Sequence, residues 1–221
     1  MTEPRSTFDD SPEWNRRYAE GRLPWDSGEP SRELERIVAE GWFDRCRALE
    51  LGCGTGTNAV FLASRGFDVT AVDVSPLAIE RAEARARAAR AKVRFLVADL
   101  RSLPHLGEPF PLVWDRGVYH HMRKVDLDAF LGTLEKHVAQ GGWYLTLAGN
   151  ANDTAPEGEG PPRVDAVSIA SELGRLFDLV QLREFRFDGV VADGDPVEPL
   201  AWSALFRRRS GARADAPGRQ G

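Results

Sequence analysis

Short apolar runs alternate with helix-like stretches along most of the chain, beginning near residue 47. The apolar runs predict strands over residues 48–51, 67–72, 93–97, 112–114 and 143–148. The stretches between them predict helices over residues 58–65, 76–91 and 127–138, and a shorter helix is expected over residues 169–177. An alternation of this kind predicts a parallel sheet that is covered by helices on both faces.

The C-terminal part of the chain departs from this alternation. Two β-like runs, residues 180–187 and 201–206, are joined by an acidic turn with no helix between them. Strands that are connected without a crossover helix pair antiparallel, so we expect a hairpin at the sheet edge. The predicted fold is α/β, a Rossmann-like doubly wound sheet of seven strands that is mostly parallel and ends in a C-terminal antiparallel hairpin.

The helix predicted from residue 76 has a clear start signal. Ser75 is expected to be its N-cap, and Pro76 suits the first helical position. Glu83 and Arg87 have the spacing of an ion pair along one helix face. We interpret the many arginines of this helix as a solvated face.

The composition fits one globular domain, because 221 residues with 42% hydrophobic and 29% charged residues can form a full core. Only three of the 29 basic residues are lysines, an excess of arginine that could suggest nucleic-acid binding or reflect coding bias. The net charge of −5 argues against a general polyanion binder. No apolar run reaches the length of about 18 residues that a membrane span needs, and the first ten residues do not resemble a signal peptide. We therefore expect a cytoplasmic protein. Cys46 and Cys53 match no zinc or redox spacing and are expected to be structural thiols.

The chain is expected to divide into three parts. Residues 1–43 form an aromatic front segment, which is either a lid or a core-packing helix. Residues 44–209 carry the predicted sheet, and the polar residues 210–221 are expected to form a flexible tail.

A glycine-rich loop follows the first predicted strand. Residues 50–56 read Glu-Leu-Gly-Cys-Gly-Thr-Gly and lie between a strand and a helix, where open α/β sheets bind their ligands. Glycines allow the backbone to approach a ligand closely. The dinucleotide pattern Gly-x-Gly-x-x-Gly is not met, because residue 57 is Thr. The acid before the loop, Glu50, suits a cationic ligand better than a diphosphate.

Acidic residues end four successive predicted strands, namely Glu50, Asp73, Asp99 and Asp115. A carboxylate at the position of Asp73 can accept hydrogen bonds from both hydroxyls of a ribose. Asp99 is placed to accept a hydrogen bond from the exocyclic amine of an adenine. Together these acids predict a rim that fits a ligand with an adenosine, an ammonium and a sulfonium.

The loop and the acids after the second and third strands resemble those of class I S-adenosylmethionine-dependent methyltransferases, over residues 47–209. The resemblance implies S-adenosylmethionine as the cofactor, with its methionine part at the glycine loop, its ribose at Asp73, and its adenine framed by Asp99 and Leu100. The cofactor-binding residues that we predict are Trp14, Trp25, Glu50, Gly52, Gly54, Asp73, Val74, Asp99, Leu100 and Asp115. Residues 44–209 would form the methyltransferase domain.

Two further segments resemble one subgroup of that family. Trp-Asp-Arg-Gly at residues 114–117 resembles a segment of the thiopurine S-methyltransferases. The aromatic residues Trp14, Tyr18 and Trp25 resemble the stretch with which these enzymes, and related thiol and halide methyltransferases, cover the cofactor. The His120-His121 pair is outside that pattern, so a thiopurine substrate is not implied. The Asn/Asp-Pro-Pro-aromatic segment of nucleic-acid amino-methyltransferases is replaced by Asp-Arg-Gly-Val-Tyr at residues 115–119, which disfavours nucleic acid.

Two residues after the fourth strand are candidates for catalysis. Arg116 could favour the thiolate form of a thiol acceptor, or it could form a structural ion pair with Asp115 or another acid. His120 could act as general base. Adjacent histidines in a regular segment cannot both face a pocket, so we expect at most one of His120 and His121 to act. We expect no metal site, because no helical i,i+4 histidine pair exists.

The predicted function is methyl transfer from S-adenosylmethionine to a small molecule, most plausibly a thiol or another soft nucleophile, by in-line displacement. O- or N-methylation of a specialised metabolite is an alternative on the same scaffold. A cofactor-binding protein without methyl transfer is a second alternative, and a nicotinamide reductase a third. No nucleic-acid or membrane partner is expected, and nothing in the sequence indicates an oligomeric state.

Overall fold

The computed structural model describes residues 11–21, 23–156, 160–188, 190–192 and 195–210. Its strands are β1 (Arg47–Leu51), β2 (Asp68–Asp73), β3 (Val93–Val97), β4 (Phe110–Arg116), β5 (Val138–Asn150), β6 (Arg163–Val164), β7 (Phe177–Arg186), β8 (Val190–Ala192), β9 (Asp195–Val197) and β10 (Leu200–Arg208). Its helices are α1 (Ser11–Glu20), α2 (Arg32–Glu40), α3 (Thr57–Ser64), α4 (Pro76–Ala89), α5 (Tyr119–Val125), α6 (Leu127–His137) and α7 (Ala166–Leu173). The predicted tail, residues 210–221, lies outside the described residues apart from Ser210.

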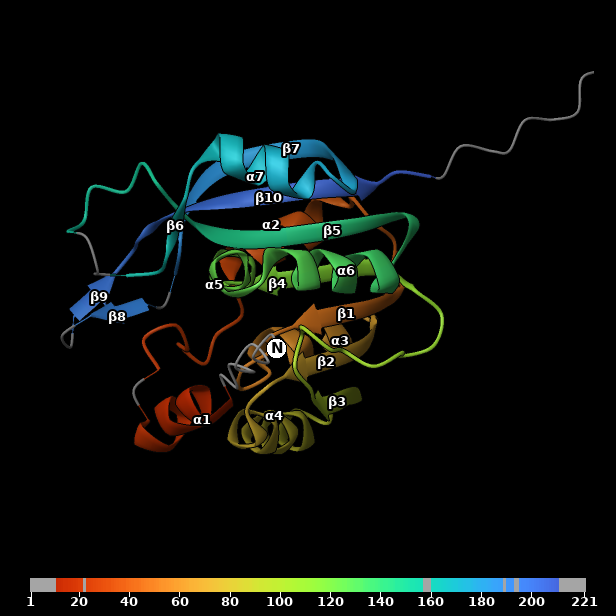
Figure 1. The fold of residues 1–221 in the computed structure, drawn as a ribbon. Coiled ribbons are helices and arrows are strands. Elements are labelled where there is room, and N and C mark those ends of the chain that lie inside the picture. Colours follow the sequence, from red (N-terminus) through yellow and green to blue (C-terminus); the bar gives the residue numbers. More distant parts are fainter. Residues whose placement is uncertain (1–10, 22, 157–159, 189, 193–194, 211–221) are drawn as a thin grey trace, which may run out of the picture.

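One mixed sheet runs through the molecule in the order β3-β2-β1-β4-β5-β10-β7, with the short strand β6 paired to β5 (Figure 1). Neighbouring strands from β3 to β5 are parallel, whereas β10 is antiparallel to both β5 and β7. The predicted doubly wound sheet with a C-terminal antiparallel pair is therefore confirmed. Since β10 inserts between β5 and β7, only β7 lies at that edge of the sheet.

Two hydrophobic clusters explain why the central strands are apolar on both sides. One cluster contains Phe130 of α6 and Ile169 of α7, and the other contains Ile37 of α2 and Leu62 of α3. Strands β1 and β4 contribute to both clusters and are buried at nearly every position. A sheet covered on both faces needs apolar residues in succession rather than in alternation, as these strands have.

Helix α4 begins as predicted. The Ser75 hydroxyl accepts a hydrogen bond from the backbone nitrogen of Ala78 at 3.2 Å, and Pro76 occupies the first turn. Glu83 and Arg87 form the expected solvent-exposed ion pair at 3.5 Å.

The interpretation of the α4 arginines as a solvated face is only partly right. Arg85 donates to the carbonyl oxygen of Thr55 in the glycine loop at 3.0 Å. Arg81 donates to the carbonyl oxygen of Tyr18 in α1 at 2.7 Å. These two side chains connect α4 to the loop and to α1, so they help to position the segments beside the site.

Several element boundaries differ from the prediction, and two of them have a clear tertiary cause. Strand β5 begins at Val138 rather than after the Gly141-Gly142 pair, because a register shift opposite β4 accommodates the glycines within the strand. Phe177 starts β7 instead of ending a helix, and its ring is fully buried against Tyr144 and Phe206. In both places tertiary packing, rather than local propensity, decides the outcome.

The described part of the front segment, residues 11–21 and 23–43, contributes two helices that pack in different places, whereas residues 1–10 lie outside the described residues. Helix α1 lies beside α4 (Figure 1), where Asn15 accepts hydrogen bonds from the Ser75 hydroxyl at 2.9 Å and from the backbone nitrogen of Leu77 at 3.2 Å. Helix α2 instead packs Leu34 and Ile37 into the core. No helix in the described ranges is long and apolar enough to cross a membrane.

Candidate active site

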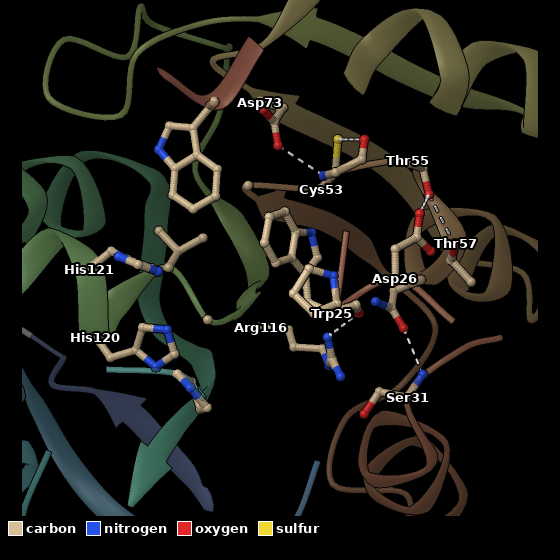
Figure 2. Close-up of a pocket in the computed structure, with 18 of the residues that line it drawn as sticks. Trp25, Asp26, Ser31, Cys53, Thr55, Thr57, Asp73, Arg116, His120 and His121 are labelled. Carbon is tan, nitrogen blue, oxygen red and sulfur yellow. Dashed lines mark hydrogen bonds between the residues drawn. The ribbon is translucent and has the colours of Figure 1, made fainter. Parts of the chain in front are cut away.

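A cavity of about 530 Å³ lies at the carboxyl ends of the parallel strands. Its walls come from the glycine loop, the ends of β2 and β4, helix α5, and the front segment. Figure 2 shows His120 and His121 on one side and Asp26, Thr55 and Thr57 on the other, with Trp25 and Arg116 between them. The volume falls in the range of about 300–1,000 Å³ that is typical of small-molecule sites.

The glycine loop adopts a backbone that side chains would prevent. Gly52 has φ +64°, and a Cβ there would lie 2.3 Å from Cγ2 of Val118. Gly54 has φ +54°, and a Cβ there would lie 3.0 Å from the hydroxyl of Tyr18. Both glycines line the cavity, so the loop presents its backbone directly to a ligand.

Asp73 ends β2 and lines the cavity. One carboxylate oxygen accepts from the backbone nitrogen of Gly54 and the other from that of Ser75, each at 2.9 Å. Burial raises the pKa of Asp73, and the backbone hydrogen bonds oppose this effect. The Val74 backbone also contributes, and since a carboxylate has about four acceptor positions, at least one remains for a ligand.

Asp99 and Leu100 follow β3 and line the same cavity, as does Val74. Asp99 forms an ion pair with Arg101, in which Oδ2 and Nη2 are 2.5 Å apart, and it also accepts from the Arg101 backbone nitrogen at 2.8 Å. Burial alone would raise the pKa of Asp99, but the Arg101 guanidinium outweighs it and holds that pKa below its ordinary value. The carboxylate is therefore ionised and able to accept.

Glu50 carries an unsatisfied acceptor. The residue is 2% exposed, lines the cavity, and its Oε2 atom has no hydrogen-bond partner among the described residues. Burial, together with the charges of Asp73 and Asp115, raises the pKa of Glu50 well above its ordinary value. A cationic group in the cavity would supply the missing donor and reverse that shift.

Asp115 is not part of the cavity, which corrects its predicted place in the acidic rim. Its carboxylate is fully buried and accepts hydrogen bonds from the Tyr144 hydroxyl at 2.6 Å and the Thr146 hydroxyl at 3.2 Å. It also accepts from the backbone nitrogens of Val118 and Tyr119 at 2.9 and 3.1 Å. Burial raises the pKa of Asp115 to about 6. Three of these donors converge on Oδ1 and the Tyr144 hydroxyl on Oδ2, so Asp115 shapes the turn from β4 into α5.

The predicted aromatic residues of the front segment do come together at the cavity. The rings of Trp14 and Trp25 lie 5.6 Å apart at 77°, and those of Tyr18 and Trp25 lie 6.4 Å apart. Trp14 also contacts His121 edge to face, at 5.3 Å. Aromatic faces of this kind attract cations and exclude water.

Arg116 lines the cavity at the end of β4 and forms no ion pair with Asp115. Its Nη1 donates to the carbonyl oxygen of Trp25 at 2.8 Å, and its Nη2 donates to that of Asp188 at 2.9 Å. The guanidinium also stacks on Phe187, at 4.8 Å from the ring centroid. Burial lowers its pKa, whereas the nearby Asp188 and Asp26 oppose that change. Arg116 thus connects the front segment to the loop after β7.

Both histidines of α5 line the cavity, contrary to the expectation that only one would. Their rings are 4.8 Å apart. Nδ1 of His120 accepts a hydrogen bond from the backbone nitrogen of Gly149 at 2.9 Å. Burial lowers the pKa of His120 well below its ordinary value and that of His121 to about 4. Within the described ranges no group of three or more His, Cys, Asp or Glu residues could hold a metal ion.

Sequence reasoning missed a polar wall formed by Asp26, Ser31, Thr55 and Asp188. Asp26 accepts from the Thr55 hydroxyl at 2.6 Å, and Asp188 accepts from the backbone nitrogen of Arg32 at 3.1 Å. Ser31 Oγ and Asp188 Oδ1 are buried without a partner in the described part of the chain. The sequence search looked for acidic residues at the ends of the predicted strands, and none of these four residues ends a strand of the parallel sheet. The adjacency of Asp26 to Trp25 was the one available signal.

The cavity fits S-adenosylmethionine. Glu50 offers an unpaired acceptor to an ammonium, Asp73 retains acceptor capacity for ribose hydroxyls, and Asp99 is an ionised acceptor near the end of β3. The indole rings of Trp14 and Trp25 also line the cavity, and the Arg17 guanidinium lies over the Trp14 ring at 4.9 Å from its centroid.

Comparison with known proteins points the same way. A family model described as a methyltransferase domain matches residues 48–142. The chain is 25% identical over 175 residues to the 2-heptyl-1-hydroxyquinolin-4(1H)-one methyltransferase of Mycobacteroides abscessus, covering 79% of this chain and 75% of that protein. It is 28% identical over 135 residues to the probable thiol methyltransferase 2 of Arabidopsis thaliana, covering 61% of this chain and 60% of that one.

A solved structure described as converting a disulfide bond into a thioacetal group during echinomycin biosynthesis superimposes with a TM-score of 0.81. It shares 25% identity and covers 92% of this chain and 94% of its own. The segment that the family model matches starts inside β1 and spans the glycine loop and the acidic residues that line the cavity. The chain therefore resembles the class I S-adenosylmethionine-dependent methyltransferases, and the matched domain and the relatives support methyl transfer from S-adenosylmethionine to a small molecule.

Proposed function

We propose that the methyl acceptor is a thiol or another soft nucleophile that reacts as an anion. The observation that carries this proposal is the environment of Arg116, whose guanidinium donates only to carbonyl oxygens among the described residues. Its Nε–H is buried there without an acceptor. An arginine remains protonated in proteins, so this side chain brings a positive charge to the cavity. No carboxylate forms an ion pair with it among the described residues, although Asp188 and Asp26 lie near enough to offset part of that charge. Such a charge favours the thiolate over the thiol, whose ordinary pKa is about 8.5.

The cofactor residues are assigned by their positions in the cavity. Gly52, Gly54 and Glu50 would hold the methionine part, with Glu50 accepting from the ammonium. Asp73 would accept from the ribose, since its carboxylate lines the cavity and keeps acceptor capacity.

The remaining cofactor residues lie on either side of these. Asp99 with Leu100 and Val74 would frame the adenine. Trp14 and Trp25 would face the sulfonium, in contacts worth about 0.5–2 kcal/mol.

Alignment and exclusion of water are the main tasks of the protein in this reaction. Bound S-adenosylmethionine supplies a methyl group that is activated by a positively charged sulfur. The aromatic residues of α1 and the following loop keep water from the reacting atoms, and Arg116 stabilises the negative charge of the acceptor before transfer. No covalent intermediate on the protein is required.

The relatives support sulfur as the acceptor atom. The Arabidopsis relative is named as a thiol methyltransferase, and the structural neighbour is described by chemistry at a disulfide. A second candidate, O-methylation, is favoured by the mycobacterial relative, whose name specifies a 1-hydroxyquinolin-4(1H)-one. An N-hydroxy group is also an acidic acceptor, so Arg116 would suit its anion equally well.

The two candidates are separated by acceptor preference. The purified protein is incubated with S-adenosylmethionine and a panel of thiols, selenols, halides, phenols, N-hydroxy compounds and amines. Release of S-adenosylhomocysteine and the methylated product is measured by mass spectrometry. We expect thiols to react with a higher kcat/KM than oxygen acids of matched pKa. Turnover of hydroxyl or amine acceptors without any turnover of thiols would overturn sulfur as the acceptor.

A further inference from the structure

His120 is held by a hydrogen bond that determines which ring nitrogen carries a proton. Its Nδ1 lies 2.9 Å from the backbone nitrogen of Gly149, near the carboxyl end of β5. A backbone N–H only donates, so Nδ1 must be the nitrogen with the free lone pair. In the neutral ring the proton therefore resides on Nε2.

The protonated nitrogen has no acceptor within the described part of the chain. His120 lines the cavity, and no described residue accepts a hydrogen bond from Nε2. Gly117 lies next to this nitrogen, and a Cβ at Gly117 would be 3.4 Å from it. The absence of a side chain at Gly117, where φ is +84°, leaves the space beside Nε2 free for a ligand.

Two cations, Arg116 and Lys124, and a second imidazole, His121, lie around the ring and oppose its protonation. His121 and Lys124 lie on the same helix, and Arg116 approaches from β4. Burial, followed by these three groups, lowers the pKa of His120. A base at this position would become an imidazolium among cations, and its lone pair on Nδ1 is already used by Gly149. Both features disfavour proton abstraction by His120.

We propose that His120 acts as a neutral hydrogen-bond donor to the acceptor atom, and that the enzyme therefore selects acceptors that are already ionised. The inference rests on the proposed function and specifies the ionisation state of its acceptor. A lone pair of the anionic acceptor forms the new bond to the methyl carbon. The bond between that carbon and the sulfonium sulfur breaks at the same time, and its electron pair stays on sulfur as a neutral thioether. No proton moves, and Nε2 keeps its hydrogen throughout.

The tautomer can be observed without any turnover. Protein labelled with ¹⁵N in its histidines is examined by long-range ¹H–¹⁵N correlation NMR in complex with S-adenosylhomocysteine, and His120→Gln assigns the signals. We expect an unprotonated Nδ1 and a protonated Nε2 for His120 across neutral pH. A protonated Nδ1, as either the other tautomer or an imidazolium, would overturn the proposal. This experiment remains decisive even if thiols prove not to be the acceptors.

The donor role is separated from a base role by acceptors that have no proton to lose. Thiocyanate and a nitrothiophenol that is fully ionised at the assay pH are compared with an alkyl thiol that is mostly protonated. Because His120→Ala removes a hydrogen bond to a charged group, it should lower kcat/KM by about 10- to 100-fold for all three acceptors. His120→Gln should recover part of the loss, because its amide can place an N–H near the position of Nε2.

His105→Gln, at an exposed histidine outside the cavity, is the matched control and should behave like the wild type. The proposal is overturned if His120→Ala leaves turnover of the ionised thiol intact and removes only that of the protonated thiol. If no thiol or thiocyanate is methylated by the wild type, the sulfur acceptor fails, and the NMR result still decides the role of His120.

Discussion

Asp73→Ala tests the assignment of the ribose site most directly. The carboxylate of Asp73 accepts backbone hydrogen bonds from Gly54 and Ser75, the Val74 backbone also contributes, and at least one acceptor position remains for a ligand. A hydrogen bond from a ribose hydroxyl to a charged acceptor contributes about 1.5–3 kcal/mol. Its loss corresponds to roughly tenfold to hundredfold weaker binding.

The affinity for S-adenosylhomocysteine is measured by isothermal titration calorimetry, because this product occupies the cofactor site without turnover. Loss of the carboxylate also frees the backbone nitrogens of Gly54 and Ser75, so the melting temperature and circular dichroism of each variant are recorded. Asp73→Asn keeps one carbonyl oxygen for the loop and separates the two effects. Asp73→Asn should bind S-adenosylhomocysteine more tightly than Asp73→Ala does, and its melting temperature should be closer to that of the wild type.

Asp68 provides a matched control, since it lies at the opposite end of the same strand with an exposed side chain. Asp68→Ala should leave the affinity for S-adenosylhomocysteine unchanged. The reasoning is refuted if Asp73→Ala is folded and binds S-adenosylhomocysteine within about threefold of the wild type, which is well below the loss of even one charged hydrogen bond.

Three further predictions concern the other walls of the site. Arg116→Gln removes the charge and should lower kcat/KM for thiols at neutral pH, with the difference from the wild type shrinking in pH–rate profiles as the thiol ionises by itself; a constant difference at all pH values would refute the charge argument. Trp14→Ala should weaken binding of S-adenosylmethionine by up to about 2 kcal/mol but affect uncharged S-adenosylhomocysteine less, because a cation–π contact acts only on the sulfonium, and calorimetry with both ligands checks this. Asp115, whose pKa is raised to about 6, binds its proton more tightly in the folded state, so its contribution to stability is present below its unfolded pKa and is lost as pH rises through about 6. Relative to Asp115→Asn, the wild type should therefore lose on the order of 3 kcal/mol of unfolding free energy between acidic and neutral pH, as measured by urea denaturation, and parallel pH curves for the two proteins would contradict the shift.

Much of the fold was predictable because its signals are local. The parallel strands, the cap at Ser75 and the glycine loop each follow from a short pattern whose physical cause lies within a few residues. The C-terminal antiparallel pair was predictable from the missing helix between two apolar runs. The exact start of β5 was not, because it depends on a register shift against β4 that no local preference encodes.

The residues of the site likewise divide into those that the local sequence predicted and those that tertiary packing placed. Open α/β sheets bind ligands at the carboxyl ends of their strands, and this rule found Glu50, Asp73 and Asp99, which line the cavity. Their carboxylates in turn predicted a cationic nucleoside ligand. The same rule misplaced Asp115, since a residue at a strand end can point either into the cavity or into the protein. Only the tertiary structure shows four donors converging on its carboxylate from α5 and β5.

The sequence determined the chemistry of the cofactor site because the glycine loop and the acids are set by their own strands. Tertiary packing instead places Arg116 and His120 on the wall of the cavity where the methyl acceptor would bind, because segments that are distant along the chain meet there. Arg116 binds carbonyl oxygens from residues 25 and 188, and His120 takes its tautomer from Gly149. Hydrogen bonds between such distant groups form only once the chain has folded, so no spacing in the sequence could reveal whether His120 donates a hydrogen bond or acts as a base.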